Sequence, residues 1–167
     1  MMPVDRRAAL RCLAASMGAA AGFTTAMAPA WAASDASERL VPTSSDLRAS
    51  LEQSLARNEP LIVLATLQGC PFCKVARENY LVSELKAGRA VTQIHFLSRD
   101  PVRDWQGNEV THGQLVKQLQ IEAAPTLLFY GRNAVEVAPR LVGGSTSDFY
   151  GAYLDERVAQ ARAAIRR

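Results

Sequence analysis

The chain has 167 residues, enough for one domain with a substantial core. It is 49% hydrophobic and 21% charged, values typical of a globular protein. Arg6, Arg7 and Arg11 against Asp5 give the first 33 residues a net charge of +2, so the remaining 134 residues carry only +1. Nucleic-acid-binding domains usually carry a clear excess of basic residues, and these residues do not, so we expect no nucleic-acid partner.

The N-terminus is predicted to be a signal peptide that covers residues 1–33. A positively charged start, "VDRRAALR", precedes residues 12–33, which contain no charged side chain. This run ends in "AWAA", which contains an A-x-A sequence typical of signal-peptide cleavage sites. We therefore expect a periplasmic protein whose mature part is one domain over residues 34–167.

The export route and the fate of this segment stay open. Arg6-Arg7 resembles a twin-arginine signal, but Asp5 and Ala9 depart from that pattern, so Sec export is the alternative. The uncharged run is also long enough to cross a membrane and act as an N-terminal anchor. Its small and hydroxyl residues favour a cleaved signal instead.

Hydrophobic periodicity predicts alternating helices and strands after residue 42. The expected elements, in chain order, are a helix over 43–60, a strand over 61–67, a helix over 71–87, a strand over 90–97, a helix over 111–120, a strand hairpin over 125–142 and a final helix. The strand at 61–67 is a continuous apolar run, typical of a strand buried on both faces of a sheet. This order predicts an α/β fold with a central mixed β-sheet flanked by helices.

Short patterns indicate where some of these elements begin. Thr43 with Asp46 gives a cap-like start to the first helix, and Thr111 with Gln114 forms a capping box. Residues 98–110 are polar and rich in turn formers, so they are predicted to form a loop.

The last helix is predicted to be capped by Ser145 or Thr146. Its apolar positions are expected to be Phe149, Tyr153, Val158 and Ala161.

The stretch "LQGCPFCKVA", residues 67–76, places Cys70 and Cys73 just after the buried strand. Cys70 stands at the start of the next helix, and Pro71 suits the first helical turn. Unsatisfied backbone N–H groups and the helix dipole favour a thiolate at Cys70. Cys73 lies nearly one turn further on, close enough to attack a mixed disulfide at Cys70. The spacing predicts Cys70 as the nucleophile and Cys73 as the resolving thiol.

The sequence disfavours three other interpretations of the cysteine pair. A zinc site needs about four ligands, and the chain offers only this pair with His95 and His112, so we expect no metal. A purely structural disulfide would close a very short loop and stabilise little. A copper chaperone would use the thiols as soft ligands, but all four methionines lie before residue 28, which argues against copper.

Several other side chains near these patterns are interpreted as structural. Lys74 and Glu78 are expected on a solvated face of the helix, and His95 is expected to pack within its strand. Trp105 and His112 border the polar loop, where they are candidates for shaping a partner surface.

Three segments together resemble the thioredoxin-fold superfamily over residues 45–160. They are C-P-F-C after a central strand, "IEAAPTLLFYGRNAVEV" with its strand-initial proline, and "LVGGSTSDFYGAYLDERV" with its glycine pair and last helix. The stretch "WQGNEVTHGQLVKQLQIEAAPT" further resembles the periplasmic thioredoxin-related (SoxW-like) group. Two positions depart from thioredoxin: Gly69 replaces a Trp, and Leu64 replaces the buried acid of that family.

The resemblance implies a site in which Pro125 is cis and lies against the dithiol. The backbone of Ala124 would then pair with an extended partner peptide. The catalytic residues would be Cys70 and Cys73, which would form the Cys70–Cys73 disulfide. The substrate-binding residues implied are Ala124, Pro125, Thr126, Pro71 and Phe72. No metal or organic cofactor is implied.

The function implied is that of a periplasmic thiol–disulfide oxidoreductase acting on protein substrates. The SoxW-like resemblance indicates a reductant of sulfur-oxidation or cytochrome c maturation proteins, supplied with electrons by a membrane thiol transporter. We expect a monomer. The alternatives are a disulfide oxidant or isomerase, and a noncatalytic thioredoxin-like binding module or metal chaperone.

Overall fold

The central sheet of the protein is mixed and has four strands. The computed structural model describes residues 36–143 and 149–167, all within the unit Ala33–Arg167, so the predicted signal peptide lies outside the described residues. The strands, in the spatial order β2–β1–β5–β6, are β1 (Leu61–Thr66), β2 (Ala90–His95), β5 (Thr126–Tyr130) and β6 (Glu136–Val142). β1 pairs in parallel with β2 and antiparallel with β5, which pairs antiparallel with β6.

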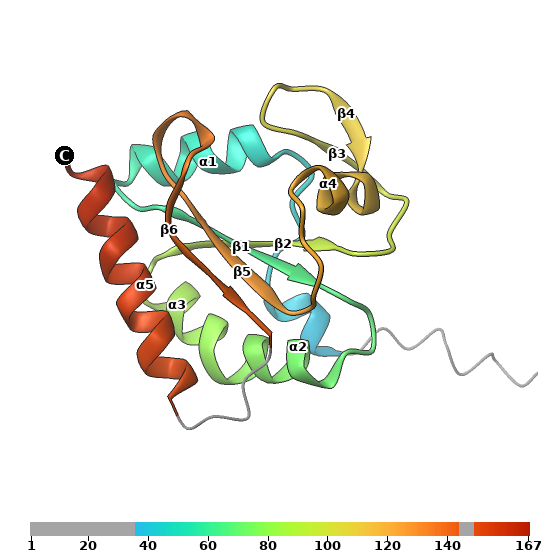
Figure 1. The fold of residues 1–167 in the computed structure, drawn as a ribbon, viewed down its shortest axis with the longest axis horizontal. Coiled ribbons are helices and arrows are strands. Elements are labelled where there is room, and N and C mark those ends of the chain that lie inside the picture. The colour runs from blue at the N-terminus through green and yellow to red at the C-terminus, as the bar shows by residue number, and fades with distance from the viewer. Residues whose placement is uncertain (1–35, 144–148) are drawn as a thin grey trace, which may run out of the picture. The chain divides into compact units, whose positions relative to one another are not determined.

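Helical segments precede, connect and follow these strands (Figure 1). They are η2 (Ala36–Leu40), α1 (Leu47–Ala56), α2 (Pro71–Val75), η3 (Ala76–Leu81), α3 (Val82–Lys86), α4 (His112–Gln118), η4 (Arg132–Ala134) and α5 (Tyr150–Ile165). The segments α2, η3 and α3 follow one another without a break, so the helix predicted over 71–87 is present, with a π-type turn in its middle. Gly88, at φ +80°, adopts the left-handed conformation that ends it, as glycine does without steric cost.

Strand β1 is buried along its whole length because both faces of the sheet are covered. Leu61, Val63 and Ala65 pack into one core with residues of α1 and α4. Ile62 and Leu64 point the opposite way, into a second core with residues of η3 and α5. Each Leu, Ile or Val among them contributes about 1.5–3 kcal/mol when fully buried. The continuous apolar run therefore predicted this strand and its environment correctly.

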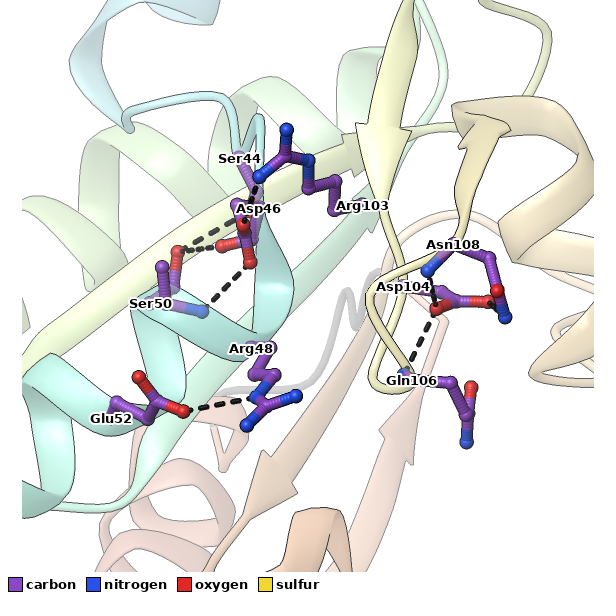
Figure 2. A network of polar contacts seen from close by, with 10 residues as sticks. Ser44, Asp46, Arg48, Ser50, Glu52, Arg103, Asp104, Gln106 and Asn108 are labelled. Carbon is purple, nitrogen blue, oxygen red and sulfur yellow. Dashed lines mark hydrogen bonds and ion pairs between the residues drawn. The ribbon is translucent and has the colours of Figure 1, made fainter.

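The residues 98–110 predicted as a loop contain a separate hairpin of β3 (Pro101–Arg103) and β4 (Glu109–Thr111). Asp104 organises the turn, since its Oδ1 accepts the backbone N–H groups of Gln106 at 2.9 Å and Asn108 at 2.8 Å (Figure 2). Each strand has only 3 residues, too few for a recognisable alternation of polar and apolar side chains.

Helix α1 is capped by Asp46, so the predicted start at Thr43 was wrong. The Oδ1 of Asp46 accepts the backbone N–H of Ala49 at 2.8 Å, which satisfies one donor of the first turn (Figure 2). Thr43 instead forms an isolated bridge with Gln93 beside β2. By contrast, the capping box predicted at the start of α4 is confirmed.

The buried face of α5 differs from the prediction at two positions. Phe149 is 66% exposed and Tyr153 is 49% exposed. Tyr150 and Leu154, one residue further on in each case, lie in the core. In each case two apolar residues are adjacent in the sequence, so periodicity alone does not show which of the two faces the core. The predicted caps at residues 145 and 146 lie outside the described residues.

We predict that Asp46→Ala destabilises the protein by about 1 kcal/mol, because the first turn of α1 loses its capping acceptor. Urea unfolding measures the change. Asp46→Asn keeps a capping oxygen and should be close to wild type. Glu52→Ala removes only an exposed ion pair with Arg48 and should change the unfolding free energy by less than about 0.5 kcal/mol. Equal stability of the Ala and Asn variants at position 46 would show that the cap contributes nothing.

Candidate active site

Cys70 caps the N-terminus of α2 with its own sulfur. Its backbone is extended, at φ −76° and ψ 115°, and its Sγ accepts the backbone N–H of Cys73 at 3.2 Å. Pro71 occupies the first turn, where backbone N–H groups have no acceptor within the helix, so the N–H that proline lacks costs no hydrogen bond. Gly69, at φ +73°, makes the tight turn between β1 and this helix. Because the side chain of Cys70 is only half-buried, a partner's sulfur can approach it.

Cys73 lies behind Cys70 and is fully buried, with 0% of its surface exposed. Burial raises the pKa of its thiol, and the hydrogen bond and negative charge of Cys70 act in the same direction. Hydrogen bonds from the Thr66 side chain and the Leu67 backbone oppose that rise. Both cysteines are free thiols, so the structure describes the dithiol form of the pair. The two thiols thus differ in exposure in the way that a nucleophile and a resolving thiol require.

The segment before β5 lies against the dithiol. The Ala124–Pro125 peptide bond is cis, as the resemblance implied. The thiol of Cys70 donates to the carbonyl oxygen of Ala124, with 3.9 Å between sulfur and oxygen. Gly143 donates its N–H to the carbonyl oxygen of Pro125 at 2.8 Å, which ties the end of β6 to the same place. The end of β1, the start of α2 and the start of β5 therefore meet at one end of the sheet (Figure 1).

The five predicted substrate-binding residues differ in exposure. Pro71 and Phe72 are exposed on α2, and Ala124 is half-buried beside Cys70. Pro125 is buried. Thr126 is also buried, and its hydroxyl donates to the carbonyl oxygen of Ala123 at 2.7 Å. The side chain of Thr126 therefore holds the loop before β5 and does not face a partner.

The interpretation of three other side chains as structural agrees with the structure. Lys74 and Glu78 form an exposed ion pair 4.0 Å long, one helical turn apart. His95 packs at the end of β2, where burial lowers its pKa.

Trp105 and His112, the candidates for shaping a partner surface, both have side chains that pack inside the molecule. Trp105 packs against Tyr130 of β5, with 4.5 Å between ring centroids. His112 is buried, its Nδ1 faces the backbone N–H of His95 at 3.4 Å, and burial lowers its pKa. Trp105 packs against the same core as Val102 and Val110 of the β3–β4 hairpin, which was absent from the prediction.

Sequence reasoning also missed two buried polar residues beside Cys73. Thr66 is the last residue of β1, and Arg77 follows Cys73 by four positions. The Nη1 of Arg77 donates to the hydroxyl oxygen of Thr66 at 2.7 Å. The spacing of Cys73 and Arg77 on one helical segment was the available pattern, since residues i and i+4 share a face.

Residues 47–157 match the family model of the thioredoxin-like domain. The chain belongs to this family. The thioredoxin fold predicted from the resemblance is thereby confirmed, and the closer resemblance to the SoxW-like group stays a prediction.

Solved structures with this fold are similar to the chain at low identity. An oxidoreductase titled DsbH is 14% identical, with a TM-score of 0.50 over 75% of this chain and 85% of its own. A thioredoxin from Thermus thermophilus is 19% identical, with a TM-score of 0.48 over 71% and 85% of the two chains. The periplasmic thioredoxin SoxS from Paracoccus pantotrophus is 18% identical, with a TM-score of 0.41 over 62% and 99%. None of the curated proteins compared with the chain matches it significantly.

No helix within 36–143 and 149–167 is both long and apolar enough to cross a bilayer. In the same ranges, no three His, Cys, Asp or Glu side chains come together in a way that could hold a metal ion.

We predict that iodoacetamide modifies Cys70 of the reduced protein well before Cys73 near neutral pH. Cys73 is buried, and its raised pKa keeps it a protonated thiol to higher pH. Quenched time points with peptide mapping give the rate at each cysteine. Urea-unfolded protein is the control, in which the two rates should become similar. Equal rates in the folded protein would contradict the assignment of nucleophile and resolving thiol.

Proposed function

We propose that the protein is a thiol–disulfide oxidoreductase that exchanges disulfides with protein partners through Cys70 and Cys73. The observation that supports this most strongly is the placement of the two sulfurs. The Cys70 sulfur is half-exposed at the N-terminus of α2, beside the cis Ala124–Pro125 bond, and Cys73 is buried behind it. A relative of the same fold is itself titled an oxidoreductase, which agrees with this class.

The reaction begins when the Cys70 thiolate attacks one sulfur of a partner disulfide. The partner's S–S bond breaks, its other sulfur leaves as a thiolate that takes up a proton, and a mixed disulfide forms at Cys70. Cys73 then attacks the Cys70 sulfur, and the partner's second sulfur leaves with the bonding electron pair and gains a proton. Two electrons and two protons have passed to the partner, and Cys70–Cys73 is a disulfide. The Cys73 N–H favours the Cys70 thiolate that begins this reaction.

Partner binding is assigned to the exposed surface around Cys70. Phe72 is 46% exposed on α2 and offers an apolar contact next to the reactive sulfur. The half-buried Ala124 offers its backbone to an extended partner segment, which would add to the start of β5. The exposed Val142, paired with Thr126 across β5 and β6, extends the apolar surface. This surface suits a segment of a protein rather than a small thiol.

The direction we propose is reduction of the partner. In the described part of the chain, one backbone N–H donates to the Cys70 sulfur, and the neighbouring Lys74 pairs with Glu78. A strongly stabilised reduced form makes an oxidant, so the small number of contacts to the Cys70 sulfur supports the opposite direction. We propose sulfur-oxidation or cytochrome c maturation proteins as substrates, a membrane thiol transporter as the electron source, and export to the periplasm by residues 1–33.

Disulfide trapping distinguishes the roles of the two cysteines. We predict that Cys73→Ser accumulates mixed disulfides with periplasmic proteins, because the attacking thiol remains and the resolving thiol is gone. Cys70→Ser should trap none, since Cys73 is buried. Cys12→Ser is the matched control and should behave like wild type. Non-reducing gels with and without dithiothreitol show the adducts. Equal trapping by Cys70→Ser and Cys73→Ser would contradict the ordered mechanism.

Insulin reduction in the presence of dithiothreitol tests turnover in the same set of proteins. Wild type and Cys12→Ser should precipitate insulin, whereas Cys70→Ser and Cys73→Ser should not. A wild-type protein without activity in this assay would favour the noncatalytic binding module.

A further inference from the structure

Arg77 is a buried cation whose role the reaction above leaves unexplained. Its side chain is 1% exposed, which is rare for arginine. Its guanidinium donates to two hydroxyl oxygens, those of Ser37 and Thr66, and within 36–143 and 149–167 no carboxylate forms an ion pair with it. Burying an unpaired charge is costly, so a buried guanidinium of this kind points to a negative charge that appears nearby.

In the resolving step of the proposed reaction, a negative charge develops on the sulfur of Cys73. Cys73 in α2 and Arg77 in the π-type segment η3 are four residues apart on continuous helical segments, and both are buried. Thr66, which is 0% exposed, contacts both of them. Its Oγ1 accepts from Arg77 at 2.7 Å, and a hydrogen bond from its side chain lowers the pKa of Cys73.

The donors and acceptors in this chain of contacts have a defined order. A threonine hydroxyl has one hydrogen to donate and two lone pairs that accept. Because an arginine N–H only donates, it occupies a lone pair of Thr66 and leaves the hydroxyl hydrogen for the sulfur. Arg77 thereby orients Thr66 as a donor to Cys73 and polarises that donor.

We propose that Arg77 is a positioning residue for Cys73 and acts through Thr66 to favour the thiolate that resolves the mixed disulfide. The proposal rests on the function proposed above. In the step concerned, the Cys73 sulfur bonds to the Cys70 sulfur and the bond from Cys70 to the partner breaks. The partner's sulfur takes the electron pair of that bond, and the proton that Cys73 gives up ends on it. No carboxylate of β1 is required, which agrees with the absence of an acidic residue from Leu61–Thr66.

The groups that face Cys73 come from three directions. Cys70 on α2 raises the pKa of Cys73, as does burial, which is the larger cause. Thr66, with Arg77 behind it, lowers it. Tyr150 on α5 is a neutral phenol close enough for the Cys73 charge to contribute to its own raised pKa, whose main cause is burial. Removing the Thr66 donor therefore shifts Cys73 toward the protonated thiol.

The experiment follows the reaction of the reduced full-length Cys12→Ser protein with Ellman's reagent in a stopped-flow instrument. The first release of thionitrobenzoate reports attack by Cys70, and the second reports resolution by Cys73. We expect Arg77→Met to leave the first release unchanged, to slow the second at neutral pH by at least about threefold, and to move its pH midpoint upward. A tenfold smaller thiolate fraction slows attack by only about threefold, since the more basic thiolate is the better nucleophile.

Matched variants separate this role from a merely structural one. Arg77→Lys keeps a charged N–H donor and should recover part of the rate. Thr66→Val should reproduce Arg77→Met, and Thr66→Ser, which keeps the hydroxyl, should resemble wild type. Arg140→Met removes a half-buried arginine paired with Glu136 and should leave both releases unchanged. If Arg77→Met does not fold, the two Thr66 variants carry the same test.

An unchanged second release in Arg77→Met and Thr66→Val would overturn the proposal, as would a slower release with an unmoved pH midpoint. Insulin reduction by the wild-type protein is measured separately. Failure of that assay alone would count against the proposed function and not against the role of Arg77, because Ellman's reagent needs no protein partner.

Discussion

The hydrogen bond from the Cys73 N–H to the Cys70 sulfur is the interaction on which the site depends. It uses a donor that every helix leaves unsatisfied in its first turn, so the fold provides it without a dedicated side chain. It holds the Cys70 sulfur in a half-exposed position, close to the carbonyl oxygen of Ala124. The tight turn at Gly69 brings the helix start directly to the end of the central strand.

Burial then gives the two sulfurs different chemistry. β1 lies between two cores, so the helix that follows it packs one side against the sheet and leaves the other in solvent. Cys73 falls on the packed side with Arg77, and Phe72 falls on the solvent side. A thiol buried in this way is protected from reagents but must still ionise to complete the reaction. The polar pair of Thr66 and Arg77 addresses that requirement from inside the core.

The sequence predicted the parts of the molecule that depend on local patterns. The apolar run of β1, the capping box of α4 and the placement of the cysteine pair at a helix start follow from residues close together in the chain. The contact between Thr66 and Arg77 joins a strand to a helix, and β3 and β4 are too short to show an alternating pattern, so one sequence gives little indication of either. The same limit explains why Thr126, placed at the site by resemblance, turned out to have a buried side chain.

The reduction potential of the Cys70–Cys73 pair tests the central claim most directly. The full-length protein is equilibrated in a series of dithiothreitol buffers, and the fraction of free thiol is measured by mass after alkylation. A reductant is expected to show one reversible two-electron transition at about −270 mV, the value of thioredoxin. The transition should be absent from Cys70→Ser. A midpoint at about −120 mV would indicate an oxidant and contradict the proposed direction, and the absence of any reversible transition would contradict the proposed chemistry itself.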